Sequence, residues 1–144
     1  MTTEPHAPAH LEPGQSITFR KTMSVAEQGF FTGISGNLGG LYVDRAQARA
    51  QGLSDMAVFE LAAGALFTTA LSRLAGPTMR IEAISFRFAR AITLGETFEA
   101  TATVGRTNGS LTCLLTGRIC DEQVAEGEAR LVPVRAGTDE AADV

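Results

Sequence analysis

The spacing of apolar residues changes about half-way along the chain. Before residue 76 they recur mainly at helical spacing, whereas after it they alternate with polar residues, as in half-buried strands. The alternating half predicts two hairpin turns, one at Asn108-Gly109, which is typical of a type I′ hairpin, and a weaker one at Asp121-Glu122. Four consecutive strands are expected at residues 78–92, 96–107, 110–120 and 122–134.

The strongest helical prediction is the segment from Asp55 to Ala75. Apolar residues surround almost its whole cylinder, and a helix that is apolar on all sides is normally buried. Two shorter helices are predicted upstream. One begins at Ser24, which forms a capping-box pattern with Glu27, and the other runs from Asp44, as N-cap, to Gly52.

These elements predict an α+β fold. A first strand at residues 16–24 precedes the helices, and four antiparallel strands follow the buried helix, so we expect the sheet to wrap around that helix. The length of 144 residues suits one domain, which we place at residues 15–135. Residues 1–14 and 136–144 are polar and are expected to be flexible tails.

Composition and charge exclude several classes of protein. Hydrophobic residues make up 44% and charged residues 19%, which indicates a globular chain. The net charge is −4 and the Lys and Arg residues are scattered, so no nucleic-acid surface is predicted. No apolar run reaches the roughly 20 residues that span a bilayer. Cys113 and Cys120 lie too far apart on one predicted strand for a disulfide, and no secretory signal is present, so we expect a cytoplasmic protein.

The positions of the histidines exclude much familiar catalytic chemistry. The chain has two, His6 and His10, and both lie in the predicted N-terminal tail. A histidine-based triad or dyad and a histidine-ligated metal site are therefore not expected. The glycine-rich stretch Gly36–Gly40 lacks the spacing of a Walker or Rossmann phosphate loop, so we expect neither a metal nor an organic cofactor.

The segment FTGISGNLGGLYVD, residues 31–44, is unusually rich in glycine, which favours a tight turn or the close approach of a ligand. Together with the capped helix before it, this segment resembles the MaoC-like dehydratases, or (R)-specific enoyl-CoA hydratases. Members carry a Thr/Ser-Gly-Asp-x-Asn-Pro-x-His-x-Asp run here. A second likeness, to a family strand with an Arg-Phe pair and a later Gly, lies at residues 84–104, where Phe88, Arg90, Ile92 and Gly95 correspond. The resemblance covers residues 14–134 and implies a hotdog fold, an antiparallel sheet around a central helix.

The resemblance also shows where the usual chemistry is missing. The family's catalytic aspartate falls on Asn37 and its catalytic histidine on Tyr42, and neither replacement is an ordinary proton carrier near neutral pH. The family's helix-start glycine, whose N–H is thought to polarise the thioester carbonyl, falls on Phe59. Loss of the acid–base pair predicts a drop of about 10²–10⁴-fold in hydratase activity. The resemblance thus assigns ligand contacts to Gly36, Gly39, Gly40, Val58, Phe59 and Arg90.

Three hypotheses follow, all with an acyl-thioester of CoA or of acyl carrier protein as ligand. The protein is a hydratase or dehydratase with Asn37 and Tyr42 in the positions of the dyad, or a thioesterase that uses Glu60, a carboxylate near the start of an apolar helix. The third is a non-catalytic subunit paired with an active MaoC-like chain. By resemblance we expect a homodimer or higher oligomer, because hotdog proteins generally associate through their sheets.

Overall fold

The computed structural model describes residues 11–135. The predicted tail segments 1–10 and 136–144, with both histidines, lie outside this range. Residues 11–14 belong to the packed domain, because Leu11 is buried in the core and the Gly14 N–H donates to the Val104 carbonyl at 2.8 Å.

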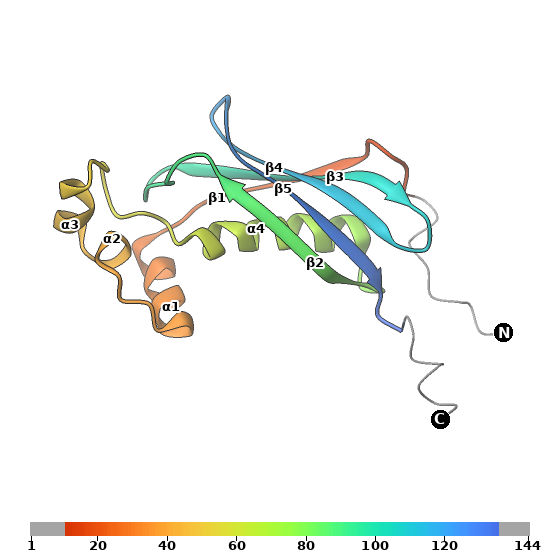
Figure 1. Ribbon diagram of the computed structural model, residues 1–144, viewed down its shortest axis with the longest axis horizontal. Helices are drawn as coiled ribbons and strands as arrows, with labels where there is room; N and C mark the ends of the chain where they lie inside the picture. The colour runs from red at the N-terminus through yellow and green to blue at the C-terminus, as the bar shows by residue number, and fades with distance from the viewer. Residues whose placement is uncertain (1–10, 136–144) are drawn as a thin grey trace.

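A five-stranded antiparallel sheet confirms the predicted α+β class. Its strand order is β1-β3-β4-β5-β2, so β2 crosses over to pair with β5, and no other strand of residues 11–135 pairs with the opposite edge of β2 (Figure 1). The strands are β1 (Ser16–Thr22), β2 (Met79–Phe88), β3 (Thr97–Thr107), β4 (Leu111–Ile119) and β5 (Glu122–Pro133).

Three short helices gather at the end of the molecule where the long helix begins (Figure 1). The predicted capping box at Ser24 and Glu27 is present, and Asp44 caps its helix by accepting the N–H groups of Ala46 and Gln47. The first helix ends at Gly36, whose φ of 71° is left-handed and therefore suits glycine. The helices are α1 (Val25–Ser35), α2 (Gly40–Val43), α3 (Arg45–Ala50) and α4 (Glu60–Ala75).

The long helix α4 starts five residues later than the sequence predicts. Its expected first turn is extended, because Ala57 forms an isolated antiparallel bridge with Thr93 and the Val58 N–H donates to the Ile92 carbonyl at 2.7 Å. Met56 and Val58 are buried in this extended conformation as they would be in a helix, so apolar content alone cannot distinguish the two.

The core lies between α4 and the inward face of the sheet. Phe67 and Leu71 of α4 are fully buried, as are Leu111 and Leu115 of β4. The expectation that α4 is buried on every side is wrong, because the sheet covers one face and Leu61 on the other is 67% exposed.

Both predicted hairpin turns differ from expectation in detail. Gly109 has a left-handed φ of 82° but Asn108 does not, and Thr107 pairs with Leu111, so the loop has three residues rather than a type I′ turn. The next turn is Cys120-Asp121, one residue earlier than predicted, and Cys120 adopts a φ of 53° there.

Candidate functional site

Tyr42 and Glu60 form a hydrogen-bonded pair where α2 meets the beginning of α4. The Tyr42 hydroxyl donates to the Glu60 carboxylate, at 2.8 Å from Oε2 and 3.1 Å from Oε1. The phenol ring stacks on Phe59, with centroids 4.4 Å apart and planes inclined by 14°. Burial, and then the hydrogen bond to Glu60, raise the pKa of Tyr42 to about 12, so the phenol is a persistent donor rather than a base.

Glu60 occupies the first turn of α4 and is exposed to solvent. The N-cap residue is Phe59, whose own side chain makes no capping hydrogen bond. Val58 and Phe59 are buried, so they anchor the start of the 16-residue helix. The N-terminal turn of a long helix presents backbone N–H groups and partial positive charge to a ligand.

Asn37 lies in the loop before α2 and makes hydrogen bonds with neighbouring residues. Its Oδ1 accepts the Gly39 N–H at 2.8 Å, and its own N–H donates to Ser35 Oγ at 3.1 Å. This is the local turn bonding common for asparagine. The side chain therefore shapes the loop, and a Cβ at Gly39 would lie 3.0 Å from Asn37 Oδ1 and 3.4 Å from the Tyr42 ring.

The other glycines assigned by resemblance have separate structural roles. Gly36 supplies the left-handed C-cap of α1. A Cβ at Gly40 would lie 1.8 Å from Gln47 Oε1, so a side chain at this position would displace the end of the Gln47 side chain.

Gln28 of α1 completes the site, and it was not among the predicted site residues. It is 3% exposed and is the one buried residue of α1. Its Nε2 donates to the carbonyls of Tyr42 at 3.0 Å and of Ala57 at 2.6 Å, and its Oε1 accepts the Phe59 N–H at 3.4 Å. An amide within a short predicted helix gives no sign in the sequence that it faces inward.

A pocket of about 470 Å³ adjoins Glu60 at the end of β2. Aromatic and cationic side chains both line it, which are the groups expected to receive an apolar chain and an anion. Its lining residues are Glu60, Phe86, Arg87, Phe88, Arg90 and Ala91.

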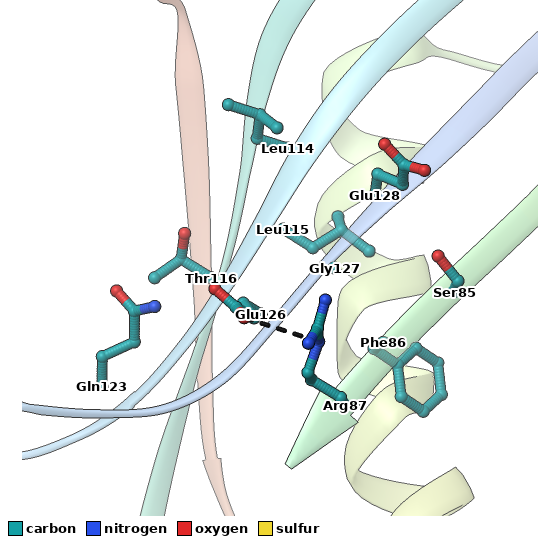
Figure 2. A pocket seen from close by; sticks show the side chains of 10 residues that line it. All are labelled: Ser85, Phe86, Arg87, Leu114, Leu115, Thr116, Gln123, Glu126, Gly127 and Glu128. Carbon is teal, nitrogen blue, oxygen red and sulfur yellow. Dashed lines mark ion pairs between the residues drawn. The ribbon is translucent and has the colours of Figure 1, made fainter. Parts of the chain in front are cut away.

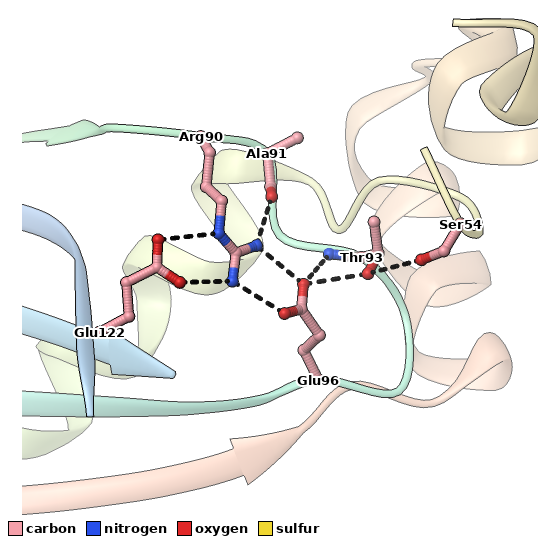
Figure 3. Close-up of polar contacts among 6 residues, drawn as sticks. All are labelled: Ser54, Arg90, Ala91, Thr93, Glu96 and Glu122. Carbon is pink, nitrogen blue, oxygen red and sulfur yellow. Dashed lines mark hydrogen bonds and ion pairs between the residues drawn. The ribbon is translucent and has the colours of Figure 1, made fainter. Parts of the chain in front are cut away.

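Arg90, assigned to the ligand by resemblance, is engaged by two carboxylates (Figure 3). Its two terminal nitrogens pair with Glu96 at 3.0 and 2.9 Å, and it also contacts Glu122 at 3.3 and 3.4 Å. Glu96 in turn accepts the backbone N–H and the hydroxyl of Thr93, and its pKa is lowered to about 2, chiefly by Arg90. Because Thr93 bridges to Ala57, this network braces the segment that leads into α4.

A second hollow, of about 550 Å³, lies on the outward face of β2, β4 and β5 (Figure 2). Arg87 and Glu126 form an ion pair of 3.4 Å across it, and both side chains are more than half exposed. It contains no paired acid and base comparable to Tyr42 and Glu60.

Two features are absent from residues 11–135. In that range no helix is long and apolar enough to cross a membrane, and no cluster of three or more metal-binding side chains occurs. Cys113 is buried and Cys120 exposed, and both are free thiols.

Comparison with known proteins gives a family and a set of similar folds. A model described as "Thioesterase superfamily" matches residues 55–127, slightly more than half of the chain. A search of curated proteins gave no significant match.

Three solved structures represent the similar folds. The (R)-hydratase PhaJ1 from Pseudomonas aeruginosa, in its unliganded form, is 22% identical with a TM-score of 0.81, over 89% of this chain and 86% of that one. An (R)-hydratase from A. caviae involved in PHA biosynthesis is 21% identical with a TM-score of 0.82, over 88% and 99%. The ChsH1-ChsH2 complex from Mycobacterium tuberculosis gives 20% identity and a TM-score of 0.77, over 85% and 98%. The chain therefore belongs to the thioesterase superfamily, and its fold is the hotdog fold that the resemblance to MaoC-like dehydratases predicted.

Proposed function

We propose that this protein binds an acyl-thioester, of CoA or of acyl carrier protein, at the N-terminus of α4 and hydrolyses it with Glu60 as general base. One observation carries the proposal: the exposed Glu60 carboxylate is held by the Tyr42 hydroxyl at the N-terminal end of a long helix. The thioesterase superfamily match, which includes residue 60, supports the same chemistry.

The helix terminus supplies the electrostatic part of this mechanism. The thioester carbonyl oxygen accepts hydrogen bonds from backbone N–H groups in the first turn of α4. These hydrogen bonds stabilise the negative charge that develops on the oxygen. The acyl group lies in the adjoining pocket against Phe86 and Phe88.

Glu60 and Tyr42 supply the proton handling. A carboxylate can accept about four hydrogen bonds, so Glu60 can bind a water while it accepts the Tyr42 hydroxyl. Glu60 takes a proton from this water as the water oxygen forms a bond with the thioester carbonyl carbon. The C–S bond then breaks, and the thiolate leaves and receives that proton.

This reaction suits the available groups better than hydration does. A thiol has a pKa near 8.5, so the thiolate leaves with little help from an acid. Addition of water to a double bond also requires a proton donor to carbon, whereas the raised pKa of Tyr42 makes it a weak acid and Asn37 carries no exchangeable proton of use.

Hydration or dehydration of an enoyl-thioester is the second candidate, and the likeness of fold to two (R)-hydratases supports it. The third candidate is a non-catalytic subunit beside an active MaoC-like chain, and the assembly of ChsH1 with ChsH2 in one complex supports that arrangement. We expect at least a homodimer in the first two cases, and light scattering of the chain alone measures this.

Assays of a panel of acyl-CoAs distinguish the candidates. Hydrolysis releases free thiol, and we expect Glu60→Gln to reduce its rate by about 10²–10⁴-fold, on the scale of general acid–base catalysis. Glu128→Gln, on the outward face of β5, is the matched control and should leave the rate unchanged. Loss of absorbance from crotonyl-CoA without thiol release, abolished by Tyr42→Phe, would instead establish hydration. Binding without turnover would identify the subunit.

A further inference from the structure

We propose that Gln28 is a positioning residue: its buried side-chain amide holds the backbone of Tyr42 against the start of α4 and so keeps the phenol on Glu60. The effect on catalysis rests on the proposed function, whereas the effect on the Tyr42–Glu60 contact does not.

The contacts of Gln28 join two segments that are far apart in the sequence. The Nε2 group of Gln28 donates to the backbone carbonyl of Tyr42, 14 residues away, and to that of Ala57, 29 residues away. Its Oε1 accepts a hydrogen bond from the backbone N–H of Phe59. The amide thus uses both of its N–H donors and its oxygen on backbone groups on either side of the site. Because Gln28 is only 3% exposed, bulk water does not compete for these hydrogen bonds.

Tyr42 needs this support because the helix that carries it has few anchors of its own. Helix α2 has four residues, none of them buried, and its N-cap makes no side-chain hydrogen bond. Two other contacts join this segment to residues 57–59, namely the bond from the Ala57 N–H to the Leu41 carbonyl at 3.0 Å and the stacking of Tyr42 on Phe59. All of these contacts reach residues 57–59, and the Gln28 side chain bonds both to Tyr42 and to residues 57 and 59.

The geometry predicts a catalytic defect rather than only a loss of stability. A displacement of about 1 Å at a reacting group can cost about 10²-fold in rate. Without the Gln28 amide the Tyr42 segment separates from α4, so Glu60 loses the donor that orients it. Substrate contacts along the acyl pocket are unaffected, because Gln28 does not line that pocket.

The test combines turnover with a probe that needs no substrate. Tyr42 is the only tyrosine and the chain has no tryptophan, so intrinsic emission reports on this phenol alone. A phenol that donates to a carboxylate loses emission by transferring its proton in the excited state. We expect Gln28→Met, which keeps the size but not the hydrogen bonds, to raise emission to the level of Glu60→Gln. It should lower kcat for thiol release at least tenfold and change KM less than twofold.

A second variant covers the case in which Gln28→Met does not fold. In Gln28→Glu the introduced carboxyl has nearly the same shape, and burial between two carbonyl oxygens raises its pKa. It donates when protonated and repels those oxygens when ionised. The kcat profile should therefore gain an alkaline fall that the wild type lacks, with emission rising over the same pH range.

Gln51→Met, at the exposed end of α3, is the matched control and should behave as the wild type. The proposal is overturned if folded Gln28→Met keeps wild-type emission and kcat, or if the Gln28→Glu profile follows that of the wild type. If the wild type releases no thiol, the proposed function fails, but the emission of the variants still decides the role of Gln28.

Discussion

Tyr42 is the only tyrosine of the chain, and its neighbours determine its protonation state and its hydrogen bonds. It stacks on Phe59, donates to Glu60 and has a pKa raised to about 12, so it stays protonated across the physiological range. Its role is to orient the carboxylate, and the carboxylate is the group that can exchange protons with water.

The titration of this phenol is directly measurable. We predict that absorbance near the tyrosinate band gives an apparent pKa near 12 for Tyr42. Glu60→Gln should lower this pKa only in part, because burial, the largest cause of the increase, remains while the charge of Glu60 and its hydrogen bond as a carboxylate are lost. A folded-state pKa above the unfolded value stabilises the protein fully below pH 10, and this contribution is lost as the pH rises through 12. The same value in wild type and variant would contradict the pairing.

Single residues of the site were partly predictable. The resemblance to MaoC-like dehydratases points to Tyr42, which stands where the family has its catalytic histidine, and Glu60 is conspicuous as a carboxylate in an apolar helix. The contact between Tyr42 and Glu60 could not be predicted from the sequence, since it depends on the extended residues 56–59 and on the short helix α2. Gln28 was missed because burial of an amide depends on tertiary contacts that periodicity does not encode.

The packing of α4 on β2 depends on a glycine in the helix. A Cβ at Gly64 would lie 2.1 Å from Cζ of Phe86, whose ring has Phe67 and Phe88 as neighbours at 5.8 and 5.6 Å. This close approach brings the aromatic wall of the pocket against the helix that carries Glu60.

Alanine substitutions test that packing. Gly64→Ala should lower the free energy of unfolding by about 1–3 kcal/mol, because the aromatic ring must move. Gly29→Ala is the matched control in α1, where nothing lies within 4 Å of the added methyl, and it should raise the free energy by about 0.5–1 kcal/mol. Urea unfolding measures both, and a gain in stability for Gly64→Ala would contradict the packing described.

The segment between β2 and β3 is braced by charge. Arg90 and Glu96 pair through two hydrogen bonds and are each about one-third exposed or less, and Glu96 also holds Thr93. Through the bridge from Thr93 to Ala57 this brace supports the beginning of α4.

Acid titration tests this brace. We predict that Glu96→Gln lowers the free energy of unfolding by about 1–2 kcal/mol at pH 7, somewhat less than a fully buried charged hydrogen bond because of solvent screening. The folded-state pKa of Glu96 is lowered from 4.5 to about 2, so its stabilisation is present above pH 4.5 and is lost as the pH falls toward 2. The difference from wild type should vanish over that range. Glu126→Gln, which removes the exposed pair with Arg87, should cost little at any pH, and an equal cost for both variants would refute the distinction.

At the scale of elements, the sequence predicted most of the architecture. The strand boundaries agree within a few residues because alternation and turn residues are local signals. The start of α4 was misplaced because residues 56–58 take their conformation from pairing with residues 92–94, a contact between distant segments. The type I′ turn predicted at Asn108-Gly109 was also wrong, since this residue pair alone does not determine the length of the loop, which has three residues.

At the scale of the whole molecule, residues 11–135 leave two kinds of surface uncovered. One is the outer edge of the two terminal strands of the sheet, β1 and β2, to which no further strand of these residues pairs. The other is a set of exposed apolar side chains on or beside α1 and the start of α4, namely Phe30, Ile34, Leu38 and Leu61, which are 67–82% exposed. Both agree with the expectation of an oligomer, because unpaired strand edges and exposed apolar groups are usually covered.

The central claim is that an acyl-thioester binds in front of the Tyr42–Glu60 pair at the N-terminus of α4. Titration with a non-hydrolysable thioether analogue of an acyl-CoA, followed by Tyr42 emission, tests this most directly. We predict a saturable change in emission that coincides with a rise in the melting temperature, and a reduced change in Glu60→Gln. A rise in melting temperature with no change in Tyr42 emission would place the ligand elsewhere and contradict the account.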